Sequence, residues 1–260
     1  MDLETYHQIM QAIKSILGID LKHYKDEQMR RRLDSWLARV GAANWEEYLA
    51  RIKREERELR RFRDYITINV TEFFRDPERW KELQEKVMPE LLKANSSLKI
   101  WSAGCSKGAE IYTLSIILDE LSPGKKHQLL ASDLDKGALE IAKNGGPYLA
   151  EEVRNISPVQ KSMYFKPEAP PYFLNEPIKK KVTFSEHNLI QDSYGDKHDL
   201  IVCRNVVIYF TAETKDLLYK RFYDALKPGG YLFVGGTEII PRPNEIGFRS
   251  SGFSFYRKTI

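Results

Sequence analysis

The spacing of apolar residues changes its period near residue 95 of the chain. Before that point, apolar positions recur at the three- and four-residue spacings of amphipathic helices. In residues 24–41 the shared helical face is formed by Met29, Leu33, Trp36, Leu37 and Val40. Gly41 then suits the C-cap, where left-handed backbone is favoured. The pattern predicts a helix over this segment.

Further helices are predicted before residue 95 from their capping residues. Asn44 is expected to cap the helix that follows it, because its side-chain oxygen can accept a hydrogen bond from a free backbone N–H. Asp76 and Pro77 suit the N-cap and the first position of a later helix. We therefore expect an N-terminal helical domain over residues 1–75 and a linking helix over residues 76–97.

Beyond residue 97, short apolar runs alternate with helical patterns. Strands are expected over residues 98–104, 128–135, 182–190 and 231–238, and residues 199–210 are expected to be a strand that runs into a loop. Helices are expected over residues 108–121, 136–143 and 212–230, and residues 248–258 end the chain as an antiparallel pair. This alternation predicts an α/β domain over residues 98–260, built on an open, mostly parallel, doubly wound sheet. Ligands of such sheets bind at the carboxyl ends of the strands.

One segment interrupts the alternation. Residues 146–181 are too long for a simple connection in a compact sheet, and they are rich in proline and aromatic residues. We expect a small inserted subdomain there, built around a β-hairpin.

Composition excludes several classes of protein. An apolar fraction of 42% among 260 residues argues against disorder, and no stretch has the length and apolarity of a membrane span. The N-terminus lacks the layout of a secretory signal, and Cys105 and Cys203 have neither disulfide nor metal-ligand spacing. We therefore expect a cytoplasmic protein that does not insert into membranes. The net charge of +4 permits an acidic partner without demanding nucleic acid.

A polar pair stands inside the most apolar strand. Arg204 and Asn205 follow the run from Leu200 to Val202, and apolar residues resume at Val206. Burying an unpaired guanidinium costs roughly several kcal/mol, as it does for other charged groups. The pair is therefore expected where the strand leaves the sheet, in a pocket at the binding edge.

Two other strand ends carry candidate binding groups. In "WSAGCSKGAEIYTL", Gly104 and Gly108 allow a tight turn and the close approach of a ligand, although glycines also serve geometry alone. Asp133 ends the next strand, where an acid in a nucleotide-binding sheet accepts hydrogen bonds from ribose hydroxyls. The alternative interpretation is that Asp133 caps the helix that begins near Asp135. Asn188 ends the third strand and could bond an adenine edge. Together these residues favour a nucleoside ligand without phosphates.

The segments "TINVTEFFRD", "IWSAGCSKGAEIYTL", "ASDLD", "HNL" and "CRNVVIYF" occur in that order along the chain. In this order and spacing they resemble the CheR family of chemotaxis receptor methyltransferases, over nearly the whole chain. The chain departs from the family at one point. Where the family usually has G-E-E-P-Y, this chain has Gly108-Ala109-Glu110-Ile111-Tyr112, which keeps the second acid and lacks the first acid and the proline.

The resemblance implies a seven-stranded methyltransferase sheet that binds S-adenosylmethionine and its product S-adenosylhomocysteine, with no metal. The implied cofactor-binding residues are Asn69, Thr71, Arg75, Ala103, Gly104, Glu110, Asp133, Asn188, Leu189, Arg204 and Asn205. Ala103, Gly104 and Leu189 are expected to contribute backbone groups. Thr71 has a simpler interpretation as a helix N-cap.

The resemblance also implies the substrate and its chemistry. A glutamate side chain on the cytoplasmic helices of a chemoreceptor is expected to become a methyl ester. Glutamate is ionised at neutral pH, with a reference pKa of about 4.3, so the nucleophile needs no general base. Arg75 is expected to orient the acceptor carboxylate and Tyr209 to position it. Both are the candidate catalytic residues.

The first long helix carries a basic flank. Arg31, Arg32 and Arg39 are expected to dock an acidic receptor helix, unless they form an ordinary solvated face. We expect the protein to act as a monomer.

Two other functions stay open at this point. A methyltransferase of the same fold could act on RNA or a small molecule, and its substrate affinity would then fall steeply with salt if phosphate were bound. The sequence "RNVVIYF" lacks the Asn/Asp-Pro-Pro-Tyr/Phe turn that amine methyltransferases often carry. A cofactor-binding sensor without catalysis is the other alternative, against which Arg75, Asn205 and Tyr209 argue.

Overall fold

The computed structural model describes residues 2–259, and they form two compact units. The first unit contains the chain up to Asn69 together with Ile208–Asp216. The second contains Val70–Val207 and the chain from Leu217 onward. The domain boundaries expected at residues 75 and 97 stay predictions.

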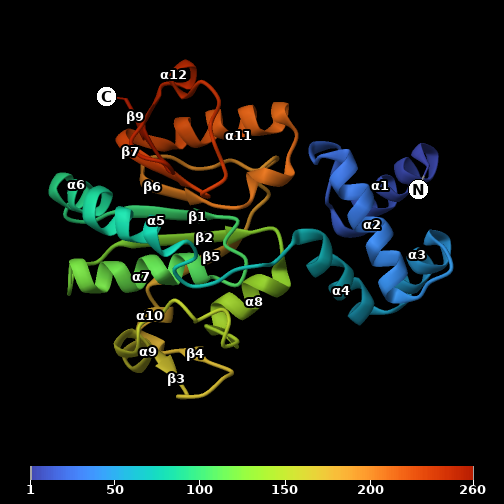
Figure 1. Cartoon of the computed structure of the whole chain (residues 1–260), viewed down its shortest axis with the longest axis horizontal. Coiled ribbons are helices and arrows are strands. Elements are labelled where there is room, and N and C mark those ends of the chain that lie inside the picture. The colour runs from blue at the N-terminus through green and yellow to red at the C-terminus, as the bar shows by residue number, and fades with distance from the viewer. Residues whose placement is uncertain (1, 260) are drawn as a thin grey trace. The chain divides into compact units, whose positions relative to one another are not determined.

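The first unit, called here the helical unit, is built from five helical segments of the N-terminal region (Figure 1). These are α1 (Leu3–Leu17), η1 (Leu21–His23), α2 (Asp26–Val40), α3 (Trp45–Arg54) and α4 (Glu56–Thr67). Trp36, Tyr48 and Phe62 pack edge-to-face or tilted against one another at its centre. The helical unit therefore has its own aromatic core.

The predicted helix ends in this unit are confirmed. Gly41 is the C-cap of α2 with φ 66°, and the Asn44 side chain accepts a hydrogen bond from the Glu47 N–H at 2.9 Å. Met29, Leu33 and Trp36 are buried, whereas Leu37 and Val40 are half-buried. The segment after Asn44 forms two helices, because the backbone at Glu55 is extended.

The second unit, called here the sheet unit, contains the predicted mostly parallel sheet. Its strand order is β5-β2-β1-β6-β7-β9-β8. The strands are β1 (Lys99–Ala103), β2 (Gln128–Asp133), β5 (Val182–Glu186), β6 (His198–Cys203), β7 (Leu226–Val234), β8 (Phe248–Ser250) and β9 (Phe255–Lys258). The first five strands in this order are parallel, and β9 is antiparallel to both β7 and β8. The strand order reverses between β1 and β6, which is where such sheets bind ligands.

Helices cover both faces of the sheet. They are α5 (Pro77–Glu82), η2 (Leu83–Val87), α6 (Met88–Ala94), α7 (Ala109–Leu121), α8 (Lys136–Asn144), α11 (Ala212–Ala225) and α12 (Pro243–Ile246). Neighbouring residues of β1 point to opposite faces: Ile100 belongs to the core cluster that contains Leu114 of α7, and the Trp101 ring lies 5.9 Å from that of Phe222 of α11. Figure 1 shows α7 and α11 on either side of the strands.

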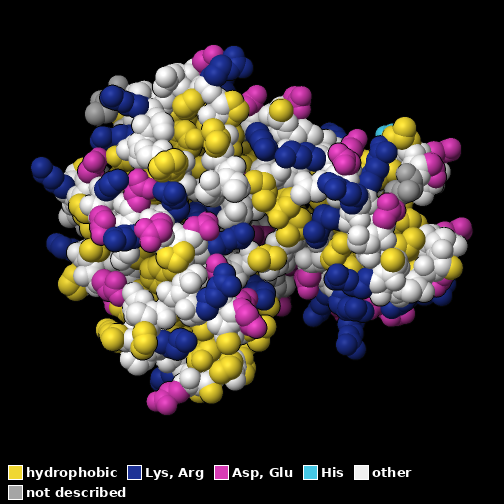
Figure 2. All heavy atoms as spheres, in the orientation of Figure 1, with side chains coloured by type: hydrophobic (Ala, Val, Ile, Leu, Met, Phe, Trp, Pro, Cys, Tyr) yellow, Lys and Arg dark blue, Asp and Glu magenta, His cyan; other side chains and the backbone are white. Residues whose placement is uncertain are grey.

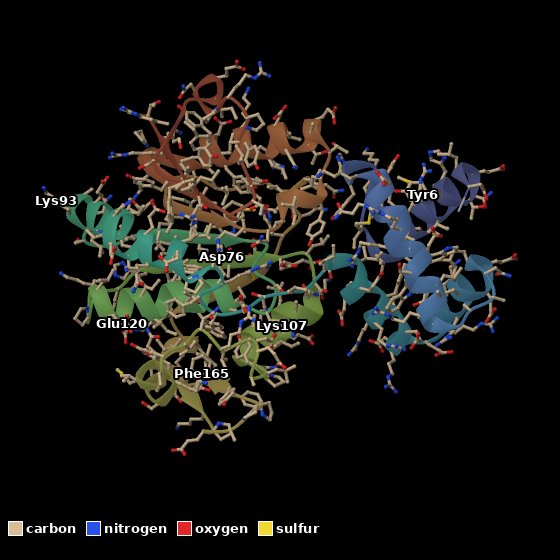
Figure 3. The ribbon with its side chains drawn as sticks, in the orientation of Figure 1. Tyr6, Asp76, Lys93, Lys107, Glu120 and Phe165 are labelled. Carbon is tan, nitrogen blue, oxygen red and sulfur yellow. The ribbon has the colours of Figure 1, made fainter. Side chains whose placement is uncertain are left out.

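The predicted insertion is a small β-subdomain. It contains α9 (Pro158–Tyr164), β3 (Phe165–Lys166), β4 (Phe173–Leu174) and α10 (Glu176–Lys179), with β3 and β4 paired antiparallel in a separate sheet. Tyr148 fastens this region to the turn after β1, because its hydroxyl donates to the Lys107 carbonyl at 2.7 Å. Its ring packs edge-on against Phe165; Figure 3 labels both Lys107 and Phe165.

Four strands end earlier than predicted. β1 ends at Ala103, β2 at Asp133, β5 at Glu186 and β7 at Val234, so the residues that follow lie in loops beyond the sheet. No helix among residues 2–259 has the length and apolarity that crossing a bilayer requires.

Candidate functional site

The predicted site residues at Gly104, Asp133 and Arg204 lie at the carboxyl ends of β1, β2 and β6. Ala103 pairs in register with Ser132 of β2, and Ser102 pairs with Val202 of β6. The loops that begin at Gly104 and Arg204 and the end of β2 at Asp133 therefore emerge at one edge.

Backbone geometry explains the glycines after β1. Gly104 has φ 81°, and a Cβ there would lie 2.7 Å from a methyl group of Val206. The N–H groups of Gly104 and Cys105 both donate to the Ser132 carbonyl at 2.9 Å, which ties the turn to β2. Gly108, with φ 84°, is the N-cap of α7. The turn thus follows the sheet edge closely and needs glycine to do so.

Asp133 holds the same turn by its side chain. Its two carboxylate oxygens accept hydrogen bonds from the Ser106 N–H at 2.7 Å and the Asp135 N–H at 2.9 Å. Burial raises the pKa of Asp133 to about 6, while the backbone N–H donors act to lower it. The alternative that Asp133 caps the next helix is wrong, because Asp135 is the N-cap of α8 and accepts from Gly137 and Ala138.

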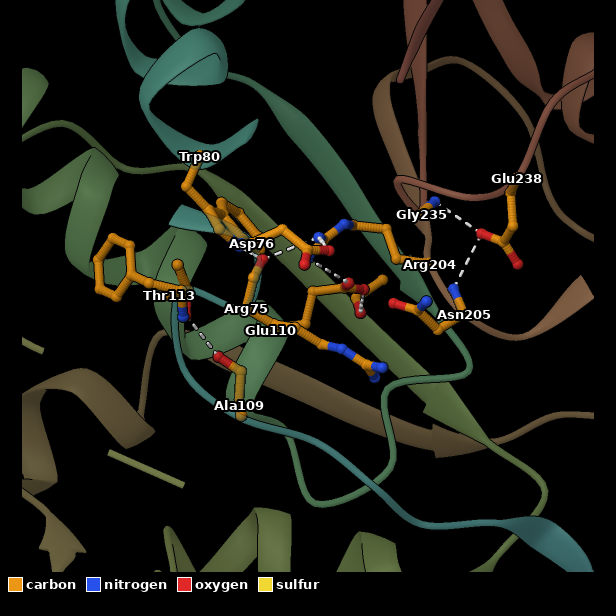
Figure 4. A network of polar contacts seen from close by, with 12 residues as sticks. Arg75, Asp76, Trp80, Ala109, Glu110, Thr113, Arg204, Asn205, Gly235 and Glu238 are labelled. Atoms are coloured by element: carbon orange, nitrogen blue, oxygen red, sulfur yellow. Dashed lines mark hydrogen bonds and ion pairs between the residues drawn. The ribbon is translucent and has the colours of Figure 1, made fainter. Parts of the chain in front are cut away.

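The Arg204 side chain is paired inside the sheet unit. One guanidinium nitrogen, Nη2, donates to the Arg75 carbonyl and to Asp76 Oδ2, both at 2.8 Å (Figure 4). Nη1 lies 3.8 Å from Glu110 Oε2. The guanidinium carbon lies 5.2 Å from the Trp80 ring centroid and 4.7 Å from that of Phe233. With 2% of its side chain exposed, Arg204 is engaged by protein groups, and its contact with a cofactor stays a prediction.

This pairing corrects the expected role of Asp76. Asp76 does occupy the N-cap position of α5, and Pro77 is the first helical residue. Its side chain makes no capping hydrogen bond, however, because the carboxylate is turned toward Arg204 and the backbone takes φ 59°. Asp76 therefore anchors the "TINVTEFFRD" segment to the end of β6.

Glu110, near the start of α7, lies close to the buried guanidinium of Arg204. The Ser102 hydroxyl donates to Glu110 Oε1 at 2.8 Å. Burial raises the pKa of Glu110 to about 7, opposed by the positive charges of Arg204 and Arg75 and by the Ser102 hydrogen bond. The negative charge of the nearby Glu238 carboxylate also raises the pKa of Glu110. A cation arriving here would favour the charged form of Glu110.

Asn205 is held by a second buried acid, Glu238. The Asn205 and Gly235 N–H groups donate to the same Glu238 oxygen, at 2.9 and 2.6 Å. This contact maintains the left-handed backbone of Asn205, which has φ 60°. The side-chain Oδ1 of Asn205 is buried without a hydrogen-bond partner among residues 2–259. Because buried acceptors are normally hydrogen-bonded, this oxygen is available to a donor group of a ligand.

The other predicted site residues of the sheet unit have local partners. The Arg75 guanidinium donates to the Val70 carbonyl at 3.3 Å, and Thr71 is half-buried. Asn188 Oδ1 accepts from the Ile190 N–H at 2.9 Å, so its amide nitrogen is the group left for a base. The Leu189 carbonyl accepts from Tyr194 and Arg221, so its backbone would contribute the N–H.

Asn69 and Tyr209 belong to the helical unit, and their assignment to the site stays a prediction. The Asn69 amide donates to the Thr67 hydroxyl at 3.1 Å. Tyr209 ends η3 (Val207–Tyr209), and its carbonyl accepts from the Lys25 N–H at 3.0 Å.

The basic flank of α2 contains one structural arginine and two exposed ones. Arg32 is half-buried, donates to the Tyr65 carbonyl and stacks 4.4 Å from the Tyr65 ring centroid. Arg31 has 73% of its side chain exposed, and Arg39 is also exposed, with its guanidinium carbon 5.5 Å from the Tyr65 ring centroid. Figure 2 shows many Lys and Arg side chains on the visible face of this unit. Arg31 and Arg39 are therefore the better candidates for contacting a partner.

Sequence reasoning missed Trp80 and Glu238. Trp80 falls in the predicted linking helix, and its spacing there indicates no role beyond packing, although an indole near a buried arginine is a common cation–π partner. Glu238 follows two glycines at the end of a predicted strand, and an acid at that edge was a usable signal.

A doubly wound sheet with a glycine turn after β1 and a half-buried acid at the end of β2 is typical of nucleoside-binding α/β domains. Comparison with known proteins gives the family. Residues 4–67 match the "CheR methyltransferase, all-alpha domain", and residues 69–255 match the "CheR methyltransferase, SAM binding domain".

Curated relatives match along nearly their whole length. A "Chemotaxis protein methyltransferase" of Listeria innocua is 36% identical over 260 residues, which are 99% of each chain. "Chemotaxis protein methyltransferase 1" of Pseudomonas aeruginosa is 37% identical over 240 residues, 88% of this chain and 87% of the relative. The chain belongs to the CheR family of S-adenosylmethionine-dependent chemotaxis methyltransferases.

The residues present fit this cofactor. S-adenosylmethionine offers ribose hydroxyls and an ammonium group as donors, and it carries positive charge on sulfur. Asp133 and the unpartnered Oδ1 of Asn205 are acceptors, and Glu110 is a half-buried acid whose charged form a cation stabilises. The donor set of the ligand and the acceptor set of the site are therefore complementary.

The raised pKa of Glu110 predicts a pH-dependent stability. The folded protein, in which the pKa of Glu110 is about 7, holds a proton on this group that the unfolded chain loses near the ordinary glutamate pKa of 4.5. Stability contributed by this group therefore falls as pH rises from 5 to 7.5. Relative to Glu110→Gln, the wild-type free energy of unfolding should fall over that range by on the order of 1–3 kcal/mol. Urea titrations of both proteins without cofactor measure this; a constant difference would contradict the shift.

Proposed function

We propose that the protein transfers a methyl group to glutamate side chains on the cytoplasmic helices of chemoreceptors and leaves methyl esters. The observation that carries this proposal is the match to the chemotaxis protein methyltransferase of Listeria innocua over 99% of both chains. The exposed arginines of α2 support it, because an acidic receptor helix is a complementary partner.

Binding of the cofactor is assigned to acceptors at the sheet edge. Asp133 accepts hydrogen bonds from ribose hydroxyls while its bond to Ser106 keeps the glycine turn in place. Asn205 Oδ1 accepts from the amino-acid part of the cofactor, and Glu110 balances its positive charge. Bound S-adenosylmethionine supplies an electrophilic methyl group on a positively charged sulfur.

The chain's own contribution to the reaction is orientation. The acceptor glutamate is already ionised, with a reference pKa of about 4.3, so no residue has to remove a proton. Arg75 orients the acceptor carboxylate through charge-assisted hydrogen bonds, and Tyr209 positions the carboxylate or the methyl group. Alignment and exclusion of water provide most of the rate enhancement, because attraction between opposite charges in the ground state does not lower the barrier.

Replacement of Asp133 should weaken cofactor binding. In Asp133→Ala the ribose hydroxyls lose their acceptor, and affinity should fall by roughly 1–3 kcal/mol in free energy. Calorimetry with S-adenosylhomocysteine in the presence of a chelator measures this. Asp133→Asn keeps one acceptor oxygen and should lose less. Undiminished affinity of Asp133→Ala would remove this residue from the site.

Arg75 and Tyr209 should affect turnover more than cofactor affinity. Arg75→Ala should lower the single-turnover rate, and Arg75→Lys should restore it only in part, because an ammonium cannot form the bidentate pair. Tyr209→Phe should slow transfer if the hydroxyl acts, whereas only Tyr209→Ala should do so if the ring acts as a wall. Rates on a receptor cytoplasmic fragment and cofactor affinities are measured separately. A full rate in Arg75→Ala would rule out the orientation role.

Charge reversal on α2 should weaken receptor binding alone. Arg31→Glu with Arg39→Glu changes two exposed residues and leaves Arg32 with its Tyr65 contacts intact. The KM for receptor fragments should rise at least about tenfold, as expected from two lost charge contacts at roughly 1 kcal/mol each, with cofactor affinity unchanged.

The matched control makes the same charge change elsewhere in the helical unit. Lys53→Glu with Arg60→Glu alters two exposed residues on α3 and α4. Equal effects of both double variants would show that net charge, and not the α2 surface, governs receptor binding.

A further inference from the structure

The segment that contains Tyr209 is held by the loop that leads into α2. The Lys25 N–H donates to the Tyr209 carbonyl at 3.0 Å, and the Thr211 N–H donates to the His23 carbonyl at 2.9 Å. Between these two bonds Tyr24 and Phe210 form an antiparallel bridge. We call this pairing of His23–Lys25 with Tyr209–Thr211 the loop ladder.

Side chains reinforce the loop ladder on both sides. The rings of Tyr24 and Phe210 lie 4.8 Å apart, edge to face, and Phe210 is buried. The His23 ring nitrogen Nδ1 lies 3.2 Å from the hydroxyl of Thr214, which is also buried. The backbone on each side of Phe210 is therefore fixed to residues of the helical unit.

The loop ladder begins where the basic helix begins. Lys25 is the N-cap of α2, and its own carbonyl accepts the first helical hydrogen bond, from Met29 at 3.0 Å. One residue thus bonds Tyr209 through its N–H and starts α2 through its carbonyl. Along the sequence, only Val206 and Val207 separate Asn205, a predicted cofactor-binding residue, from the segment Ile208–Asp216.

We infer that His23–Lys25 are positioning residues for Tyr209, so that methyl transfer depends on the loop ladder as well as on the cofactor site. This inference rests on the catalytic role proposed for Tyr209. A tyrosine acts on an acceptor only within a narrow range of positions, and a displacement of about 1 Å can cost on the order of a hundredfold in rate. With its carbonyl bonded to Lys25 and its successor Phe210 packed on Tyr24, Tyr209 keeps one position relative to α2.

Lys25→Pro removes one rung of the ladder and keeps the local backbone. Lys25 has φ −69° and Tyr24 has φ −101° and ψ 159°, values that proline and its preceding residue adopt without strain. Proline lacks the N–H, and its ring fills the space next to the Tyr209 carbonyl. Lys25→Ala is the matched control, because it removes the same charge and keeps the N–H. Tyr24→Ala is a second variant that removes the ring contact without altering either backbone bond.

The experiment is a double-mutant cycle on single-turnover methyl transfer, with saturating receptor fragment and cofactor. Wild type, Lys25→Pro, Tyr209→Ala and the double variant are compared, and Lys25→Ala is the control. Lys25→Pro should slow transfer at least tenfold, Lys25→Ala less than twofold, and the double variant should be no slower than Tyr209→Ala alone. Affinity for S-adenosylhomocysteine should not change, and hydrogen exchange at the Thr211 amide should accelerate in Lys25→Pro.

The outcomes separate this inference from the proposed function. If Tyr209→Ala slows transfer while Lys25→Pro and Tyr24→Ala run at the wild-type rate, the inference is wrong and the role of Tyr209 stands. Losses that add in the double variant would likewise overturn it, because the ladder would then act independently of Tyr209. A full rate in Tyr209→Ala would overturn the catalytic role of Tyr209 and the inference with it.

Discussion

The burial of one positive charge determines how the site is built. The Arg204 side chain is 2% exposed. Removing a charged group such as a guanidinium from water costs roughly several kcal/mol unless protein partners replace the lost hydration. The protein supplies the Arg75 carbonyl, the Asp76 carboxylate, two aromatic faces and the more distant Glu110 carboxylate. Because these partners come from three separate stretches of chain, satisfying one charge fixes the relative positions of α5, α7 and the loop after β6. The backbone of Arg75 is held by the same contact.

The departure from the family motif has a physical basis in the same region. Ala109 is fully buried, and its carbonyl accepts from the Thr113 hydroxyl at 2.8 Å. That hydroxyl also accepts from the Phe74 N–H at 3.1 Å, so the start of α7 is fastened to the "TINVTEFFRD" segment (Figure 4). Because Ala109 has no exposed surface, an acidic side chain at this position would require a buried partner for its charge. The chain therefore begins α7 with Gly108 as N-cap and keeps the acid at Glu110.

The sequence allowed the sheet, its helices, the insertion and the strand-end residues to be predicted, because each rests on local periodicity or on a glycine with one geometric use. Asp133 and Gly104 belong to this group. The partners of Arg204 could not be predicted in this way, since Asp76 lies 128 residues away and its local pattern indicates only a helix cap. The grouping of Tyr209 with the helical unit was also missed, because hydrogen bonds to His23 and Lys25 leave no trace in apolar spacing. Pairing between distant segments is decided by packing, and one sequence contains no direct record of it.

The hydrogen bond from the Ser106 N–H to Asp133 gives the glycine turn its shape before any ligand arrives. A site that is already ordered requires little loss of conformational entropy on binding. The loss of conformational entropy is equally small when the demethylated product binds, because the product presents the same nucleoside to the turn. The turn by itself therefore does not distinguish spent from fresh cofactor, and spent cofactor that occupies it would compete with fresh cofactor for the site. A metabolic state that lets the spent form accumulate would then slow methyl transfer even at an unchanged concentration of fresh cofactor.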